Sequence, residues 1–594
     1  MYPCKVIFSF AVWRQYVNIV AMYVETIPNR NSRPAILLRE AWREGKQIRK
    51  RTLANLSSWP DEKIEALRRL LKDDNLIAAE SAIVIERSIP HGHVEAVVTA
   101  IRKLGLDTMI SSRRCPEADL VIAMIAERLL DPCSKLATTR LWHTTTLAEE
   151  LGVAQADEDD LYAALDWLLA RQPRIEKNLA GRHLTEGATV LYDVTSSYYE
   201  GHTCPLAKFG HNRDGKKGMP IIVYGMLADE KGRPIAIDVY PGNTGDPTTV
   251  PPQVEKFRKH FGLKHLVIVG DRGMLTQPQI EKLKEYPEIG WISALRSQAI
   301  RKLTQNKHIQ MSIFDKKNLA EIHSPDFPGE RLVACYNPAL AEERSRKRTE
   351  LLAATEKDLA KIVCEVARRT KTPLSKVEIA KKVGKVLNRF KMGKHFSLTI
   401  DDGVFSYARK DEAILRESQM DGLYVIRTSE PAEKVSAEDA VRGYKSLAQV
   451  ERAFRCLKGV DLLVRPIHHR TENHVKAHIF LCMLAYYVEW YMRKALAPLL
   501  FQDEELEELR KTRDAVKPAQ PSASSKRKKT LKMTADGFPT HSFQTLLSEL
   551  GTLCRNKCRI GSDSNNPAFY QMTEPTPLQK RAFDLLDLYP VNGN

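Results

Sequence analysis

Cysteine is sparse in this sequence. The chain has 10 cysteines among 594 residues, whereas small domains held together by disulfides are dense in cysteine. Cys554 and Cys558 form a C-x3-C pair, but no second pair and no His-x-His motif lies near them. We interpret both as structural residues rather than zinc ligands. This cysteine usage predicts a protein of the reducing cytosol.

Long hydrophobic runs are also missing. The longest apolar stretch, about Ile479 to Val488, has half the length that a membrane-spanning helix needs and ends at Glu489. The apolar segment from Val6 to Val12 lacks the cleavage site of a signal peptide. We interpret residues 1–21 as an extension upstream of an ordinary start at Met22. The sequence therefore predicts no membrane partner.

Acidic residues are outnumbered by basic ones. Lys and Arg number 91 against 74 Asp and Glu, which gives a net charge of +17 and a pI near 9.2. Such an excess favours a polyanionic partner, nucleic acid before an acidic membrane surface. A basic surface that only maintains solubility is the alternative. With 43% hydrophobic residues, the composition is that of a globular protein of about three or four domains.

The first third of the chain divides into two predicted segments. Residues 1–80 hold the N-terminal extension, a basic hairpin that turns at Glu44-Gly45, and a helix that starts near Asp61. The hairpin and helix suit contact with a DNA backbone, although a solvated hairpin is equally consistent with the pattern. Residues 81–185 are predicted to form an all-α DNA-binding module, because apolar stripes recur at helical spacing.

The hydrophobic period changes near residue 186, where apolar β-rich runs begin. Residues 186–300 alternate strands with helices, and residues 421–500 return to this pattern, so we predict one mixed α/β sheet built from both. The remaining predicted segments are an inserted domain at 301–420, a charged linker at 501–532 and a C-terminal tail at 533–594.

Two apolar strand runs each end in an acid. Val190 to Asp193 is one run, and Val267 to Asp271 is the other. In an α/β sheet, ligands meet side chains held on rigid backbone at strand ends. A single aspartate there is usually a turn or cap residue, but two neighbouring carboxylates are costly to desolvate unless a cation lies between them. Their hard oxygen atoms favour Mg²⁺.

A third acid, Glu451, lies in a segment predicted to be one helix from Ala437 to Lys458. Tyr444, Glu451 and Lys458 are seven residues apart and therefore share one helix face. Arg455 lies one turn after Glu451 on the same side. A plain solvated row of charges is the alternative. The packing face of this helix is predicted to consist of Val450, Ala453, Phe454 and Leu457.

These motifs together resemble those of the DDE transposases of bacterial insertion sequences, in the group with a Tyr-x2-Arg-x3-Glu-x6-Lys signature. Tyr444, Glu451 and Lys458 match that signature. Leu447 stands where the signature has arginine, so Arg455 is the candidate substitute. The first acid lies in YDVTSSYYEG and the second in IVGDRGML, with YPGNTGD between them.

The resemblance covers most of the chain, about residues 30–590. It implies an α/β fold with an RNase H-like mixed sheet that is flanked by helices and interrupted by an inserted domain. The N-terminal hairpin and the all-α module would precede this core. The long interval between Asp271 and Glu451 leaves room for the insertion.

The resemblance also implies the chemistry. Asp193, Asp271 and Glu451 would bind two Mg²⁺ ions, with Mn²⁺ as a substitute and Asp193 as the bridging ligand. Two ions roughly 3.5–4 Å apart can clamp a scissile phosphate. Hydrolysis would free a transposon 3′-hydroxyl that attacks target DNA. The implied partners are the terminal inverted repeats, target DNA and a second copy in a homodimer, in the cytoplasm and at the nucleoid.

Cations near the predicted acids complete the expected DNA interface. We expect Tyr444, Lys458 and Arg455 to hold backbone phosphates near the cut, which positions DNA without reading its sequence. Arg272, Arg213, Lys216 and Lys217 are weaker candidates for phosphate contact. For each of them, a role as an ordinary surface charge is at least equally consistent with the sequence.

Four histidines lie close together in the sequence and raise the question of a metal site. His474 and His478 are four residues apart and could share an ion, but no glutamate stands as in the H-E-x-x-H motif. We therefore predict that helix packing or DNA contact explains His468, His469, His474 and His478.

Two other functions stay open on the sequence alone. The same core could serve a nuclease or a DNA-binding relative without strand transfer. A basic RNA-binding or scaffold protein with structural acids is a third reading, from a different class. Joined DNA products would indicate transposition, nicks alone a nuclease, and binding without chemistry a scaffold.

Overall fold

The computed structural model describes most of the chain, in two compact units. The first unit combines described residues up to Ser88 with Asn556–Gln571, and the second combines Ile89–Arg555 with residues after Gln571. Most of the extension at 1–21 lies outside the described residues. Those described are 19–30, 32–72, 83–306, 308–310, 314, 318–561 and 566–587.

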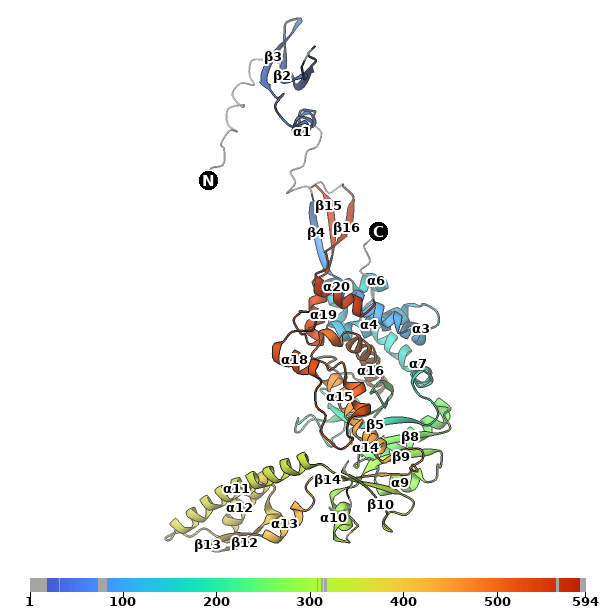
Figure 1. The fold of residues 1–594 in the computed structure, drawn as a ribbon, viewed down its shortest axis with the longest axis vertical. Helices are drawn as coiled ribbons and strands as arrows, with labels where there is room; N and C mark the ends of the chain where they lie inside the picture. The colour runs from blue at the N-terminus through green and yellow to red at the C-terminus, as the bar shows by residue number, and fades with distance from the viewer. Residues whose placement is uncertain are drawn as a thin grey trace. The chain divides into compact units, whose positions relative to one another are not determined.

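A three-stranded antiparallel sheet forms the N-terminal part of the first unit (Figure 1). Its strands are β1 (Ile19–Ile27), β2 (Ala35–Glu44) and β3 (Gln47–Asn55). The predicted turn is confirmed, because Glu44 pairs with Gln47 and Gly45 takes a φ of +64°, which glycine adopts without strain. The helix α1 (Asp61–Leu71) follows as predicted and packs on β1.

A second three-stranded sheet joins distant parts of the chain within this unit. It has the order β16-β15-β4, from β4 (Ile83–Pro90), β15 (Cys554–Ile560) and β16 (Ala568–Met572). The prediction of an all-helical segment from residue 81 is therefore wrong at its start. The β-branched run from Ile83 to Ile85 favours a strand, but its partner comes from near the end of the sequence.

The largest sheet within the described residues has eight strands, in the order β10-β11-β14-β9-β8-β5-β6-β7. Strand β5 pairs antiparallel with β6, which pairs antiparallel with β7, while β5, β8 and β9 run parallel. These five strands have the order 3-2-1-4-5, which confirms the predicted RNase H-like core. Their bounds are β5 (Ala188–Tyr198), β6 (Ile221–Asp229), β7 (Pro234–Pro241), β8 (Leu266–Gly270) and β9 (Ile289–Ala294).

The predicted helix over 437–458 is two helices, α14 (Ala437–Lys445) and α15 (Leu447–Lys458). The Ser446 hydroxyl at the break donates to the Arg442 carbonyl at 2.8 Å, a bond that competes with regular helix geometry. Helix α14 packs on β9 and α15 packs on β5. The predicted packing face of α15 is confirmed as buried, at Val450, Ala453, Phe454 and Leu457.

The segment predicted to be helical is helical from Gly92 onward, and its role in DNA binding stays a prediction. One further helix, α16 (Glu472–Ala495), packs on α4 and α7 of this module and on β7 of the sheet. Burial on all sides explains why the run at 479–488 is continuously apolar. No helix within the described residues is long and apolar enough to cross a membrane. The module contains α2 (Gly92–Lys103), α3 (Leu106–Ile110), α4 (Pro116–Leu130), α5 (Lys135–Leu141), α6 (Leu147–Leu151) and α7 (Glu158–His183).

Three α-helices lie between strands β7 and β10. Helix α8 (Val250–Lys256) precedes β8, α9 (Gln277–Leu283) lies between β8 and β9, and α10 (Ser297–Gln305) follows β9. This alternation of strands with helices is the mixed α/β pattern that the sequence predicts.

The insertion is smaller than the predicted 301–420. Strands β10 (Leu319–Ile322) and β11 (Arg331–Tyr336) extend the central sheet, because β11 pairs antiparallel with β14 (Leu423–Thr428). The insertion proper lies between β11 and β14. It contains α11 (Pro338–Arg368), α12 (Lys376–Phe390), β12 (Phe396–Asp401), β13 (Val404–Arg409) and α13 (Asp411–Ser418).

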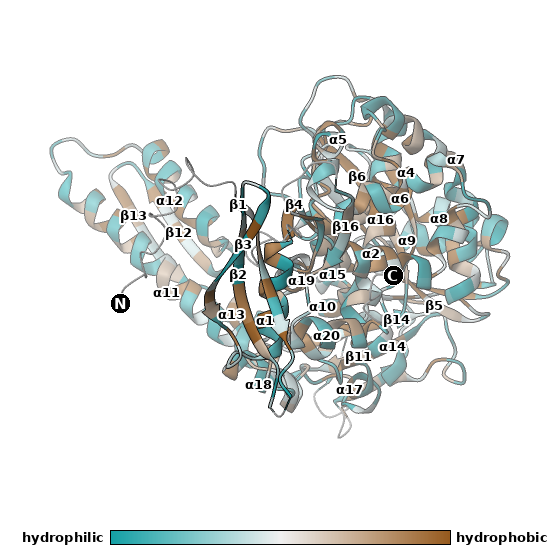
Figure 2. Ribbon diagram, turned by 90° about the horizontal axis from the view of Figure 1, so that it is seen from above, coloured by the Kyte–Doolittle hydropathy of each residue, from teal (hydrophilic) through white to brown (hydrophobic). Residues whose placement is uncertain are grey.

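The insertion has a hydrophobic core of its own. Helix α11 packs on α12 and β13, and α12 packs on β12. Figure 2 shows hydrophilic residues over much of α11 and α12, whose apolar residues are turned to this small core. At its base the Arg348 guanidinium donates to Asp421, with 3.0 Å from Nη1 to Oδ1. The core consists of Leu352, Leu359, Ile362, Val366, Leu374, Ile379, Val383, Met392, Phe396 and Phe405.

The predicted linker at 501–532 is a folded segment. It contains α17 (Leu506–Thr512) and α18 (Ala523–Leu531). Lys528 is buried, and its ammonium donates to the Ala497 carbonyl at 2.7 Å. A lysine-rich composition predicts solvation, but the Glu504 carboxylate and backbone carbonyls of the folded chain satisfy this buried ammonium.

The predicted C-terminal tail also packs onto the rest of the chain. Helix α19 (Phe543–Gly551) packs on α2, so tightly that a Cβ at Gly92 would lie 2.4 Å from the Leu550 carbonyl oxygen. Helix α20 (Pro577–Leu585) follows and buries Phe583 in the same core.

The separate core of the insertion leads to a stability prediction. Leu359 on α11 is 0% exposed, whereas Leu351 on the same helix is 36% exposed. Leu359→Ala should destabilise the insertion by about 2–5 kcal/mol, and Leu351→Ala should change it by less than about 0.5 kcal/mol. Hydrogen exchange should show faster opening at 338–409 in Leu359→Ala alone, with β5 and β8 unchanged. Equal acceleration in the central strands would contradict a separate insertion core.

Candidate active site

A cavity of about 570 Å³ opens beside the central sheet, and its walls come from β5, the end of β8 and α15. The three predicted acids, Asp193, Asp271 and Glu451, all line it. So do the predicted cations Arg455, Lys458 and Arg213. These residues, which are up to 265 positions apart in sequence, therefore share one site.

The two aspartates meet through strand register. Parallel pairing of β5 with β8 ends at Tyr192 opposite Gly270, so Asp193 and Asp271 are the next residue on each strand. Neighbouring strands lie about 4.8 Å apart. The prediction that β5 ends at its acid is wrong, because β5 continues to Tyr198 and pairs with β6 beyond Asp193.

Glu451 reaches the cavity from the helix above the sheet. Its helix, α15, turns the apolar face to β5, which leaves Glu451 and Arg455 exposed on the cavity side. Residues four apart lie on one helix face. Thus α15 contributes a carboxylate and a guanidinium to the site together.

The electrostatics of Asp193 show that the cavity disfavours an isolated negative charge. Burial raises the pKa of Asp193 to about 7, and the nearby carboxylates of Asp271 and Glu451 add to the rise. The Val194 amide, which donates to Oδ1 at 2.8 Å, and the Arg213 guanidinium oppose it. A cation among these carboxylates would remove most of this cost.

The donor set suits hard cations. All three acids offer carboxylate oxygens, which suit Mg²⁺ and Mn²⁺. Ligand atoms of the three do not all lie within 4.8 Å of one another; in the described part of the chain only Cys456, Asp461 and Glu489 meet that limit. Arg493 already bonds both acids of that second group.

Two of the predicted phosphate ligands contact acids of the protein instead. The Tyr444 hydroxyl donates to Asp271 Oδ1 at 3.2 Å, and burial together with Asp271 raises the pKa of Tyr444. The Lys458 ammonium lies 3.0 Å from Asp214 Oδ1, with only 10% of its side chain exposed. Lys458 lines the cavity, whereas Tyr444 does not line it and contacts one of the acids that do.

Arg455 is the cation that the cavity leaves available. Its side chain is exposed and forms no ion pair within the described residues. Leu447, at the arginine position of the signature, begins α15 and is 8% exposed, so this position faces the core.

One of the four weaker candidates lines the cavity, and the other three do not. Arg213 lines it and pairs with Asp246. Arg272 lines a separate cavity of about 350 Å³ that Tyr444 also borders. Lys216 lies over the Tyr198 ring, 5.5 Å from its centre, and Lys217 is exposed and lines none of these cavities.

The histidine cluster serves packing. His478 is buried, and its ring centre lies 4.7 Å from that of His469. Burial lowers the pKa of His469 to about 3, so it is neutral. His474 stacks on Tyr162 at 4.7 Å, and His468 is exposed. The prediction of helix packing is confirmed for His469, His474 and His478.

The family match follows from these motifs. The transposase DDE domain family matches residues 188–488, just over half of the chain. The chain belongs to the DDE transposases of insertion sequences. The N-terminal domain of the IS1634 family transposases matches residues 24–81 of this transposase, which include part of β1 and the whole of β2, β3 and α1.

Other comparisons add little detail. A solved synaptic complex of piggyBac transposase with hairpin DNA is similar at a TM-score of 0.30 and 11% identity. The similarity covers 74% of this transposase and 87% of that chain. No curated protein sequence matches.

The raised pKa of Asp193 predicts how stability depends on pH without metal. The pKa is 3.8 in an unfolded chain and about 7 in the folded one, so the folded protein binds the extra proton between these values. Stability should therefore fall as pH rises from about 4 to 7. Asp193→Asn removes this cost, so its melting temperature in chelator should exceed that of the wild type most at pH 8. A difference independent of pH would contradict the assignment.

Proposed function

We propose that this transposase hydrolyses phosphodiester bonds at the transposon ends and transfers the freed 3′-hydroxyls to target DNA. The observation that carries the proposal is the convergence of Asp193, Asp271 and Glu451 on one open cavity, from two strands and a helix. An open, polar groove beside a sheet suits a long polymer better than a small enclosed substrate.

We assign Asp193 as the ligand shared by two Mg²⁺ ions, with Asp271 and Glu451 on one ion each. The raised pKa of Asp193 and the all-oxygen donor set support this assignment. The bound ions would activate the attacking hydroxyl and stabilise the leaving oxygen. Tyr444 orients Asp271 through its hydroxyl, at 3.2 Å.

Arg455 contacts the DNA backbone in this proposal. Its guanidinium is exposed in the cavity one helical turn from Glu451. A planar guanidinium can donate two parallel hydrogen bonds to a phosphate. Arg455 thus takes the place of the signature arginine, from a position whose side chain can reach the cut.

The remaining parts of the proposal concern assembly. The net charge of +17 supports broad contact with DNA, and the N-terminal sheet and the helical module are the proposed readers of the inverted repeats. A homodimer on paired ends follows from the reaction, because transposition joins two ends to one target. The proposed location is the bacterial cytoplasm, at the nucleoid when bound to DNA.

The assigned ligands give the first activity prediction. Asp193→Asn, Asp271→Asn and Glu451→Gln should each lower Mg²⁺-dependent cleavage by about 10³-fold or more and keep DNA affinity, because each removes one metal ligand and no phosphate contact. Cleavage and joining are measured on DNA that carries the inverted repeats flanking the gene. Full activity in one variant removes that residue from the site, and nicks without joined products indicate a nuclease.

Arg455 can be tested against an arginine on the same helix. Arg452 lines a different cavity and bonds Gln502 at 3.4 Å, so it serves as the matched control. Arg455→Ala should weaken DNA binding and reduce the slope of log K against log salt by about 0.9, the loss of one phosphate contact. Arg452→Ala should leave the slope unchanged. Equal slopes in both variants would show that Arg455 does not touch phosphate.

A further inference from the structure

We propose that Asp214 is a positioning residue for the active site, which acts by fastening Lys458 and Arg465 and so fixes the helix of Glu451 against the strand of Asp193. The inference rests on the proposed function, because it assigns a role in the same cavity. Asp214 belongs to the loop between β5 and β6, outside the signature, and composition marks it only as one acid in the basic segment HNRDGKKG.

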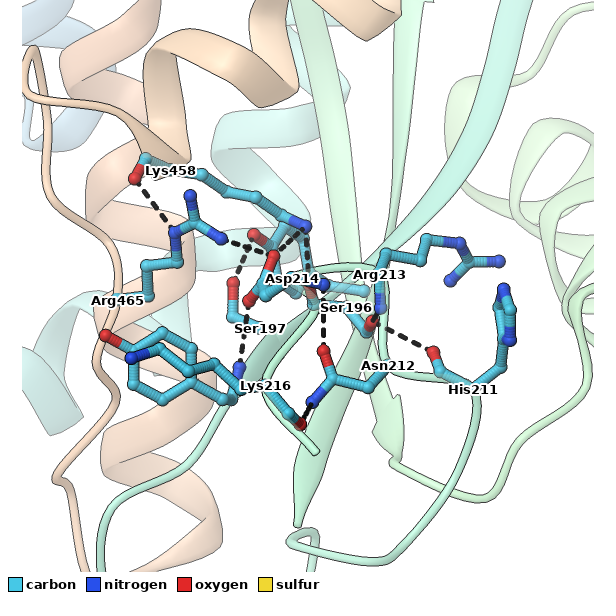
Figure 3. Close-up of polar contacts among 11 residues, drawn as sticks. Ser196, Ser197, His211, Asn212, Arg213, Asp214, Lys216, Lys458 and Arg465 are labelled. Atoms are coloured by element: carbon cyan, nitrogen blue, oxygen red, sulfur yellow. Dashed lines mark hydrogen bonds and ion pairs between the residues drawn. The ribbon is translucent and has the colours of Figure 1, made fainter. Parts of the chain in front are cut away.

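Asp214 is a buried carboxylate with a full set of partners (Figure 3). Its side chain is 2% exposed, and Oδ1 accepts from the ammonium of Lys458 at 3.0 Å and from the Arg465 guanidinium. Oδ2 accepts from the Tyr198 amide at 3.1 Å. One carboxylate therefore binds the end of β5, the end of α15 and the segment after α15.

The loop holds Asp214 rigidly. The Asp214 amide donates to Asn212 Oδ1 at 2.8 Å, and the Arg213 amide donates to the Ser196 hydroxyl oxygen at 3.2 Å. The Ser196 hydroxyl in turn donates to the His211 carbonyl at 3.3 Å. These bonds fix the loop to β5, as Figure 3 shows.

Asp214, Lys458 and Arg465 form a clamp that is connected to the proposed metal ligands. Lys458 also donates to the backbone carbonyl of Ser196, three residues after Asp193 on β5. Lys458 lies two turns after Glu451 on α15. The contact from Lys458 to Asp214 and Ser196 therefore ties the helix that carries one acid to the strand that carries another.

Charge balance explains why the clamp needs an acid. Lys458 is nine-tenths buried beside Arg465, and two cations this close repel each other unless an anion lies between them. Loss of the carboxylate would leave a buried ammonium without its partner, which is costly. The expected response is movement of Lys458 away from Arg465, and with it the end of α15.

A double-mutant cycle in the full-length protein tests this role. Asp214→Asn should lower the cleavage rate by about 10–100-fold and raise the Mg²⁺ concentration for half-maximal cleavage, as loss of an outer-shell partner typically does. The KM for DNA should stay within about 2-fold, since Asp214 itself contacts no DNA. Lys458→Met should act alike, and the double variant should be no worse than the stronger single variant. The proposal is overturned if the rate losses of the two single variants multiply in the double variant, or if Asp214→Asn needs no more Mg²⁺ than the wild type.

A second measurement does not depend on catalysis. Mn²⁺ binding, followed by electron paramagnetic resonance, should weaken about 10–100-fold in Asp214→Asn, and hydrogen exchange at 447–458 should accelerate. Asp229→Asn is the matched control, because Asp229 is equally buried and pairs with Arg233 but does not line the cavity. It should change neither readout. Equal effects in both variants overturn the positioning role.

The outcomes separate the two proposals. A wild-type protein that binds Mn²⁺ but cleaves no DNA refutes the proposed function, while the binding and exchange data still decide the role of Asp214. If Asp214→Asn does not fold, Asp214→Glu is used, which keeps the charge and moves it by one methylene. Asp214→Glu should also weaken Mn²⁺ binding, but by less than Asp214→Asn. Wild-type Mn²⁺ affinity in both Asp214→Glu and Lys458→Met would refute the positioning role of Asp214.

Discussion

The parallel register of β5 with β8 is the constraint on which the site depends. Because Tyr192 lies opposite Gly270, the next residue on each strand is an aspartate. A shift of one residue would turn one carboxylate to the other face of the sheet. The buried apolar residues of both strands determine this register, so the same packing that stabilises the core also sets the distance between two like charges.

Paired and unpaired charges divide the cavity into two parts. Asp214 pairs with both Lys458 and Arg465 at the end of β5, and Arg213 pairs with Asp246. The acids Asp193, Asp271 and Glu451 have no such cationic partner at comparable range among the residues described. The cations Lys458, Arg465 and Arg213 are therefore paired with other acids of the protein. Asp193, Asp271 and Glu451 are left without an ion pair in the part of the chain that the structure describes. The burial that raises the pKa of Asp193 is the cost of that arrangement.

The sequence predicted the strands around the acids, the buried stripe of α15 and the hairpin at Glu44-Gly45, because local periodicity and turn chemistry determine these features. It missed the break at Ser446 and the folded segment at 501–532. The first depends on a side-chain bond to the preceding turn. The second depends on carbonyls such as that of Ala497, which Lys528 meets only in the folded chain.

By itself the sequence determined which residues are chemically able to act: two acids at the ends of apolar runs and a third on an amphipathic segment. Only the tertiary structure decided which cations are already paired with protein acids, since it pairs Lys458 with Asp214 and leaves Arg455 exposed in the cavity. The physical reason is that spacing along a chain describes one helix or strand at a time. The partner of a charge comes from whichever distant segment the packing of the core brings beside it.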